Sequence, residues 1–164
     1  MYNGSNNSFR RNGQNMNNRR DYSSDQDVAL PFVSLTIDNY VDLAEMVMDK
    51  MFCDDKFNPG QKKSDLTTSK IRTLLSMSAE ILFKANNALA NEKQTLTDDL
   101  KEDLGYFRIR CAYEMGREKS VKQLDKQAHL LEHVKNVKSI SDCILFCHYL
   151  EALVAYHKYN GGKD

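Results

Sequence analysis

The segment ISDCILFCHYLEALVAYHKY, residues 140–159, carries apolar or aromatic side chains on almost every side of a helix. A helix of this kind leaves no face for solvent, so other elements must cover it all round. Ser139 precedes it as an N-cap, whose hydroxyl accepts from a free N–H of the first turn, and Gly161-Gly162 follows its end. The segment therefore predicts the central, most buried helix of an all-α bundle.

Four further helices are expected around it, each with apolar residues at helical spacing. They cover residues 38–51, a segment beginning at Thr67 or Thr68, a segment beginning after Thr97, and a shorter amphipathic piece at 120–137. The threonines are expected caps, and Gly116 is an expected stop or kink. The expected core stripes are Tyr40, Leu43, Val47 and Met51 in the first helix, Ile71, Leu74, Leu75, Ser78, Ile81 and Leu82 in the second, and Leu100, Leu104, Phe107, Cys111 and Met115 in the third.

The rest of the chain predicts one compact bundle of about five helices with a tail. The first 27 residues hold seven Asn, four Arg and three Asp and almost nothing apolar, which is too little to offset the entropy of ordering them. We expect a disordered, mildly basic tail over residues 1–30 and a helical bundle domain over 31–164. Residues 54–65, DDKFNPGQKKSD, are an expected loop around the turn pair Pro59-Gly60.

Composition excludes several classes of protein. With 23 basic and 23 acidic residues the chain is charge-neutral. It has no apolar run of the ~18–20 residues that a membrane span needs, and the first residues lack the apolar core of a secretion signal. These features predict a cytoplasmic protein without a membrane partner. In a reducing compartment Cys53, Cys111, Cys143 and Cys147, which we place in apolar helical contexts, are expected to stay free thiols.

Two patterns are compatible with a metal site. His129, Glu132 and His133 match the H-x-x-E-H arrangement of zinc hydrolases, in which two histidines on one helix face bind zinc. The alternative is a polar helix face in a charge-rich stretch, which we favour. Cys143 and Cys147, with His148 adjacent, are better explained as core residues. No nucleophilic triad or Gly-rich phosphate loop is present, so we expect no enzyme activity, no metal and no cofactor.

A basic, aromatic stretch is the strongest functional signal. Residues 104–124 read LGYFRIRCAYEMGREKSVKQL, and helical phasing places Tyr106, Arg110, Tyr113 and Arg117 opposite the core stripe, with Arg108 at its edge. Arginines hold phosphates in forked geometry, and tyrosines stack on exposed bases. The candidate RNA-binding residues are Lys70, Arg72, Tyr106, Arg108, Arg110, Tyr113, Arg117, Lys119 and Lys122, with Lys126 a weaker candidate. Since Glu114, Glu118 and Asp125 are interleaved, an ordinary solvated face stays open as the alternative.

Three blocks resemble a known family. LTTSKIRTLL at 66–75, LGYFRIRCAYEMGREKSV at 104–121 and YLEALVAYHKY at 149–159 are similar to the small subunit of type III-A CRISPR effector (Csm) complexes. The resemblance implies a helical bundle without catalytic activity, present in several copies that stack along the guide-RNA filament in antiviral defence. It also implies contact with guide CRISPR RNA and target RNA, and with the backbone and large polymerase-like subunits, which perform the chemistry.

The resemblance carries over only to matching positions. These are Lys70 and Arg72 in the first block and Arg108, Arg110, Arg117 and Lys119 in the second, whereas Lys122 and Lys126 lie outside the firm match. The Asn-rich leader and the H-x-x-E-H residues match nothing in the family pattern. Two rival functions remain: a helical protein-interaction adaptor without RNA contact, and the zinc hydrolase.

Overall fold

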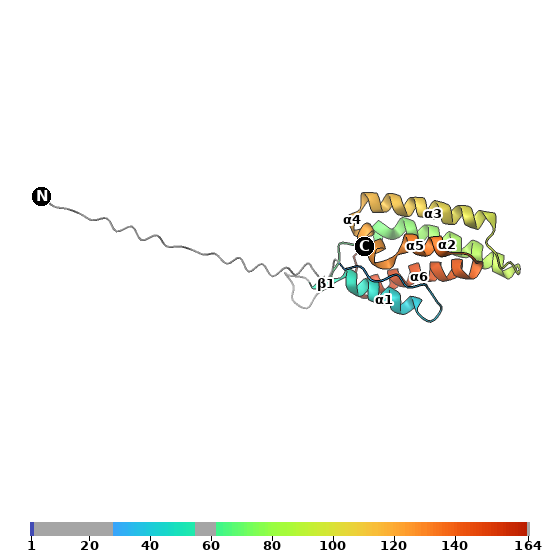
Figure 1. The fold of residues 1–164 in the computed structure, drawn as a ribbon, viewed down its shortest axis with the longest axis horizontal. Coiled ribbons are helices and arrows are strands. Elements are labelled where there is room, and N and C mark those ends of the chain that lie inside the picture. Colours follow the sequence, from blue (N-terminus) through green and yellow to red (C-terminus); the bar gives the residue numbers. More distant parts are fainter. Residues whose placement is uncertain (2–27, 55–61, 164) are drawn as a thin grey trace.

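The computed structural model describes Met1, residues 28–54 and residues 62–163. This part of the chain forms six helices and one short pair of strands (Figure 1): α1 Tyr40–Met51, β1 Cys53–Asp54, β2 Lys62–Lys63, α2 Thr68–Ala90, α3 Asp98–Arg117, α4 Lys119–Ala128, α5 Leu130–Asn136 and α6 Ile140–Tyr159. The predicted all-α class is confirmed. The predicted tail falls almost entirely outside the described residues, as does the middle of the predicted loop at 54–65.

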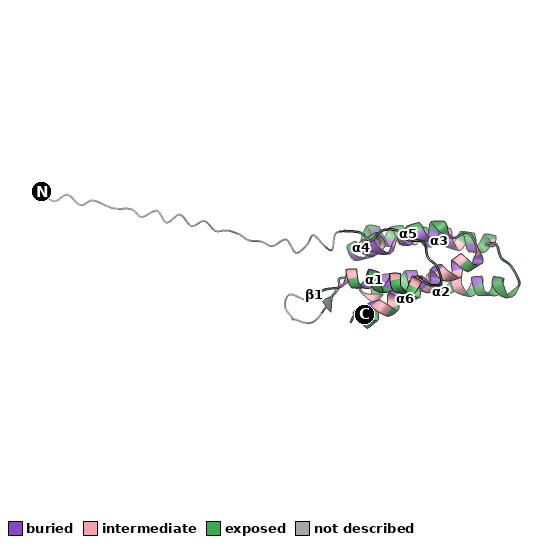
Figure 2. Ribbon diagram, turned by 60° about the horizontal axis from the view of Figure 1, so that its bottom comes forward, coloured by how far each residue is buried: buried purple, intermediate pink, exposed green. Residues whose placement is uncertain are grey.

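Helix α6 contacts every other helix, as its sequence predicts. Phe146 meets Phe107 of α3 edge to face, with ring centroids 5.4 Å apart. The Tyr149 hydroxyl donates to the Ala128 carbonyl at the end of α4, and its ring packs on His133 of α5. Helices α1 and α2 flank α6 along its length (Figure 2), while α3, α4 and α5 form a second layer. These contacts bury eight residues of α6, whereas one side of the helix, which includes Ser141, Glu151 and Ala155, stays exposed. The expectation that α6 is covered on all sides is therefore wrong.

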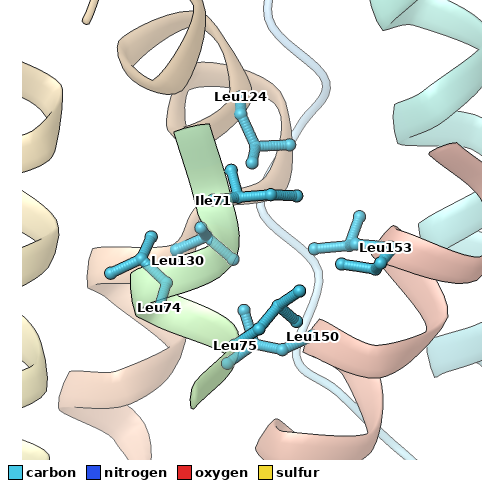
Figure 3. A pocket seen from close by; sticks show the side chains of 8 residues that line it. Ile71, Leu74, Leu75, Leu124, Leu130, Leu150 and Leu153 are labelled. Atoms are coloured by element: carbon cyan, nitrogen blue, oxygen red, sulfur yellow. The ribbon is translucent and has the colours of Figure 1, made fainter. Parts of the chain in front are cut away.

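Aliphatic side chains meet where four helices join. Ile71, Leu74 and Leu75 of α2 point towards Leu124 of α4, Leu130 of α5, and Leu150 and Leu153 of α6 (Figure 3). The small gap between them is lined by no polar atom, so it offers nothing to orient a ligand. It is part of the core.

The predicted helix at 120–137 is two helices. His129 adopts a left-handed conformation, with φ 50° and ψ 38°, and separates α4 from α5. Such a conformation is uncommon for a residue with a Cβ atom and needs outside support. Two contacts supply it: Asp125 accepts from the Leu131 N–H at 3.0 Å, and His129 Nε2 donates to the Leu30 carbonyl at 2.7 Å.

Two other expectations need correction. Cys53 is exposed and lies in β1, because the chain leaves α1 one residue earlier. In α1 the fully buried residues are Ala44, Val47 and Met48. Of the predicted stripe only Val47 is fully buried, while Tyr40, Leu43 and Met51 are partly buried and pack against the core. The reason is that α1 packs against both α6 and α4, so its buried face is rotated and wider than a single stripe.

Of the three N-caps that the sequence predicts, two form a side-chain hydrogen bond to the backbone and one does not. Thr97 accepts from the Leu100 N–H, and Ser139 forms a reciprocal capping box with Asp142. Thr67 occupies the N-cap position of α2, but its hydroxyl contacts Ser69 Oγ at 2.9 Å and makes no bond to a backbone N–H. Gly161, at φ 84°, follows α6 as expected.

Replacing Ser139 with alanine should lower the free energy of unfolding by about 1 kcal/mol, because the first turn of α6 loses its hydroxyl acceptor. Thr67→Ala is the matched control and should change it by less than about 0.5 kcal/mol. Urea denaturation followed by circular dichroism measures both. Equal losses for the two variants would show that the capping geometry is not what stabilises α6.

Candidate nucleic-acid interface

The three sequence blocks meet at one end of the bundle. Lys70 Nζ at the start of α2 lies 3.3 Å from Ser120 Oγ at the start of α4. His157 near the end of α6 donates from Nε2 to the Leu66 carbonyl at 2.9 Å, and the Thr68 N–H donates to the Lys163 carbonyl. Segments far apart in sequence therefore form one structural unit next to the exposed end of α3.

Helix α3 exposes a continuous face, which we call the α3 outer face: Tyr106, Ile109, Arg110, Tyr113 and Arg117. Its predicted core stripe is buried as expected. Tyr106, Ile109 and Tyr113 are 57%, 65% and 55% exposed, respectively. Large side chains exposed side by side make this face a candidate contact surface. Sequence reasoning missed Ile109, although its spacing from Tyr106 and Tyr113 puts it on the same face.

Two arginines flank one tyrosine on this face. The guanidinium carbon of Arg110 lies 5.2 Å from the centroid of the Tyr113 ring, and that of Arg117 lies 5.9 Å from it. These distances are within the range of cation–π attraction. The structure thus brings together the three residues that the sequence placed on one side of the helix.

Glu114 joins the same two arginines from beneath. Arg110 Nη2 is 3.2 Å from its Oε1, and Arg117 Nη2 is 3.0 Å from its Oε2. The Glu114 side chain is 2% exposed, so its interpretation as part of a solvated face is wrong. Arg110 lies four residues before Glu114 and Arg117 three residues after it. Residues at these spacings are neighbours on a helix, so the sequence could have predicted both ion pairs.

Lys70 is partly exposed and contacts neighbouring elements of the fold. Its ammonium donates to the Asp65 carbonyl at 2.8 Å and lies 3.8 Å from Glu118 Oε2. Glu118 also pairs with Arg117, at 3.9 Å. Lys70 therefore links the start of α2 to the junction of α3 and α4.

The other candidate cations are exposed and separate from this cluster. Arg72, Arg108, Lys119 and Lys122 are exposed, and within the described residues no ion pair is found for them. Arg108 is two residues from Arg110, which turns it by about 200° around the helix axis. It therefore projects from the other flank of α3, and the structure does not bring it to the α3 outer face.

The two histidines of the H-x-x-E-H motif contact aromatic rings, whereas Glu132 is exposed. His129 is the N-cap residue of α5, and its ring and that of His133 both pack against Phe32. The His133 ring lies between Phe32 and Tyr149, with centroids 4.9 and 5.3 Å away. Burial, and to a smaller extent the charge of His129, lowers the pKa of His133 to about 4. His133 is buried, so the interpretation of this residue as part of a polar helix face is wrong.

The remaining candidate groups are also accounted for. Cys143 and Cys147 are fully buried, as predicted; a hydrogen bond with Cys143, together with burial, raises the pKa of the Cys147 thiol. Among the residues that the structure describes, no three His, Cys, Asp or Glu side chains gather closely enough to hold a metal ion. Nor does any helix in the described ranges have the length and apolar character to cross a membrane.

The fold and the surface define an all-α bundle with a basic, aromatic helix face. Residues 48–163 match the sequence model of the family described as Csm2 Type III-A. A CRISPR system Cms protein Csm2 from Streptococcus thermophilus is 40% identical over 130 residues, which cover 79% of this chain and 98% of that protein. A CRISPR system Cms protein Csm2 from Mycobacterium tuberculosis is 38% identical over 134 residues, which cover 80% of this chain and 99% of that protein. A CRISPR system Cms protein Csm2 from Enterococcus italicus is 36% identical over 99 residues, which cover 57% of this chain and 67% of that protein.

The chain belongs to the type III-A Csm2 family. The resemblance to the small subunit of type III-A CRISPR effector complexes, predicted from three short blocks, is confirmed. The family match includes all of the α3 outer face and begins within α1.

The pKa of His133 predicts a pH dependence of stability. The folded protein disfavours the protonated imidazolium form of His133. Below pH 6.5, the ordinary pKa of histidine, the unfolded chain therefore binds more protons than the folded protein does. Stability is therefore full above about pH 6.5 and falls towards pH 4, by ~2–3 kcal/mol for this group. His133→Phe keeps an aromatic ring and should remove that part of the decline, measured by urea denaturation at pH 7 and pH 5.

His148→Gln is the control, because His148 lies on the surface beside Glu151. It should leave the pH dependence of wild type unchanged. An unaltered decline in His133→Phe would mean that other groups cause it.

Proposed function

We propose that this chain is the non-catalytic small subunit of a cytoplasmic type III-A CRISPR ribonucleoprotein effector, and that it contacts the backbone of the guide and target RNA. Several copies stack along the filament, beside the backbone subunits and the large polymerase-like subunit, in antiviral defence. Family membership supports the place in the effector. RNA contact is supported by the geometry of the α3 outer face.

The observation that carries this proposal is the Arg110–Tyr113–Arg117 cluster. Two guanidinium groups and one aromatic ring share an open helix face. Each guanidinium has five N–H donors, and the contacts to Glu114 use only some of them. The others can bind phosphate oxygens, while the exposed tyrosines can stack on unpaired bases.

Such contacts are independent of sequence. Base pairing by the guide supplies specificity, and the protein supplies charge and shape. The chain has no net charge, so the affinity of one copy for RNA should be weak and sensitive to salt. Several copies anchored on one filament raise the effective concentration and make weak contacts sufficient.

The opposite sign of charge lies on α1. Asp42, Glu45 and Asp49 are exposed there, together with Val41 and Met46. An acidic surface repels phosphate, so this side of the bundle is suited to protein neighbours within the effector.

One observation favours the adaptor as a second candidate function. Ile109 is the most exposed large residue on the α3 outer face, and an aliphatic side chain neither stacks on a base nor binds a phosphate. It fits a protein contact, in which the arginines would pair with acidic groups of a partner subunit.

Substituting both arginines separates the two functions. In assembled effector, Arg110→Ala with Arg117→Ala should weaken target-RNA binding about 10-fold or more and lower the salt slope by about 2, since two phosphate contacts are lost. The number of copies of this subunit should not change. Filter binding at several salt concentrations, with native mass spectrometry of the complexes, measures both quantities.

Lys101→Ala is the charge control, because Lys101 lies on α3 and pairs with Asp98. It should leave both quantities unchanged. Complexes of the double variant that lose copies of this subunit yet keep their affinity for target RNA would establish the adaptor instead.

A further inference from the structure

We propose that Glu114 is a positioning residue, whose buried carboxylate sets the two guanidinium groups of Arg110 and Arg117 in place for RNA. This rests on the proposed RNA contact, which it deepens. The sequence offers three acidic residues among the basic ones of this region, and only Glu114 is buried.

The burial of Glu114 is the first argument. A carboxylate removed from water is costly unless opposite charges and hydrogen bonds replace the water. At 2% exposure Glu114 is almost completely removed. The structure places one arginine on each of its oxygens, at 3.2 and 3.0 Å. The position of the carboxylate therefore fixes where both guanidinium groups can lie.

The ring of Tyr113 is the second argument. Both guanidinium groups that contact Glu114 also lie within 6 Å of this one ring centroid. A free arginine side chain loses considerable rotamer freedom when it is immobilised on a ligand. Here the carboxylate and the ring already hold both side chains, so less freedom is lost when phosphate binds. Pre-organisation of this kind improves affinity without a new contact.

The two arginines are held to different degrees. Arg110 makes an aligned hydrogen bond to Oε1 and is 32% exposed. Arg117 is 56% exposed, and its contact with Oε2 is an ion pair whose N–H is not aligned as a hydrogen bond. Arg110 is therefore the fixed member of the pair. Arg117 has the freedom to turn towards a phosphate while it stays near the carboxylate.

A competing role for Glu114 predicts the opposite result. If the carboxylate only reduced the positive charge of this face, its removal would strengthen the attraction for phosphate. If it positions the arginines, removal should weaken binding although the net charge rises by one. Glu118→Gln is the matched control, because Glu118 gives the same charge change but lies 3.9 Å from Arg117 Nε and is 31% exposed.

The experiment compares Glu114→Gln and Glu118→Gln in the full chain with a fluorescein-labelled single-stranded RNA, by anisotropy at about 50 mM salt. Glu114→Gln should bind about 5-fold more weakly than wild type. Glu118→Gln should bind as wild type or more tightly. Equal or tighter binding by Glu114→Gln would overturn the positioning role.

A second measurement does not involve RNA. In wild type the Tyr113 ring current should move the side-chain proton resonances of Arg110 and Arg117 upfield. Glu114→Gln should return them towards free-arginine values, while Glu118→Gln should not. Unchanged shifts in Glu114→Gln would contradict positioning whatever the RNA result. Glu114→Gln could lose these shifts while Arg110→Ala and Arg117→Ala leave the RNA affinity unchanged. That result would support the positioning of the arginines by Glu114 and reject the proposed RNA contact.

Glu114→Asp covers the case in which Glu114→Gln does not fold, as judged by circular dichroism. It keeps the charge but withdraws the carboxylate by one methylene, so it should reduce the shifts of both arginines and the RNA affinity in part. Unaltered shifts and affinity in a folded Glu114→Asp variant would show that the placement of the carboxylate is irrelevant.

Discussion

The packing of the other helices against the buried side of α6 shapes the whole molecule. Phe146 reaches α3, His148 reaches α1 and Tyr149 reaches both α4 and α5, while α2 packs along a further flank of α6. Because α2 lies between α6 and much of α3, α3 needs only one buried stripe. Its other side is left for the exposed tyrosines and arginines. The candidate interface is therefore a consequence of how the core is packed.

The charges on that face are balanced internally. Glu114 and Glu118 offset part of the positive charge of Lys70, Arg110 and Arg117. Guanidinium groups that are paired with carboxylates attract phosphate less strongly than unpaired ones. In return, their positions are better defined. In a filament of several copies the loss of attraction matters little, because anchoring by neighbours supplies the effective concentration.

Periodic features could be predicted from the sequence, and features created by tertiary contact could not. The α3 core stripe and the Ser139 cap follow from spacing and local hydrogen bonding, whereas the exposed side of α6 does not. The break at His129 could not be foreseen, because it depends on Leu30, a residue almost a hundred positions away. The burial of Glu114 was equally hidden: a glutamate among arginines predicts a solvated pair until the packing is known. The spacing of the two arginines around Glu114 can be read from the sequence, but it does not show whether Glu114 is buried.

Photo-crosslinking of assembled effector to target RNA that carries 4-thiouridine tests the central claim most directly. The account predicts crosslinked peptides of this subunit that contain Tyr106 or Tyr113, and their loss when Arg110 and Arg117 are both replaced. Crosslinks confined to other surfaces of the subunit, with the α3 outer face instead joined to a neighbouring protein chain, would contradict it.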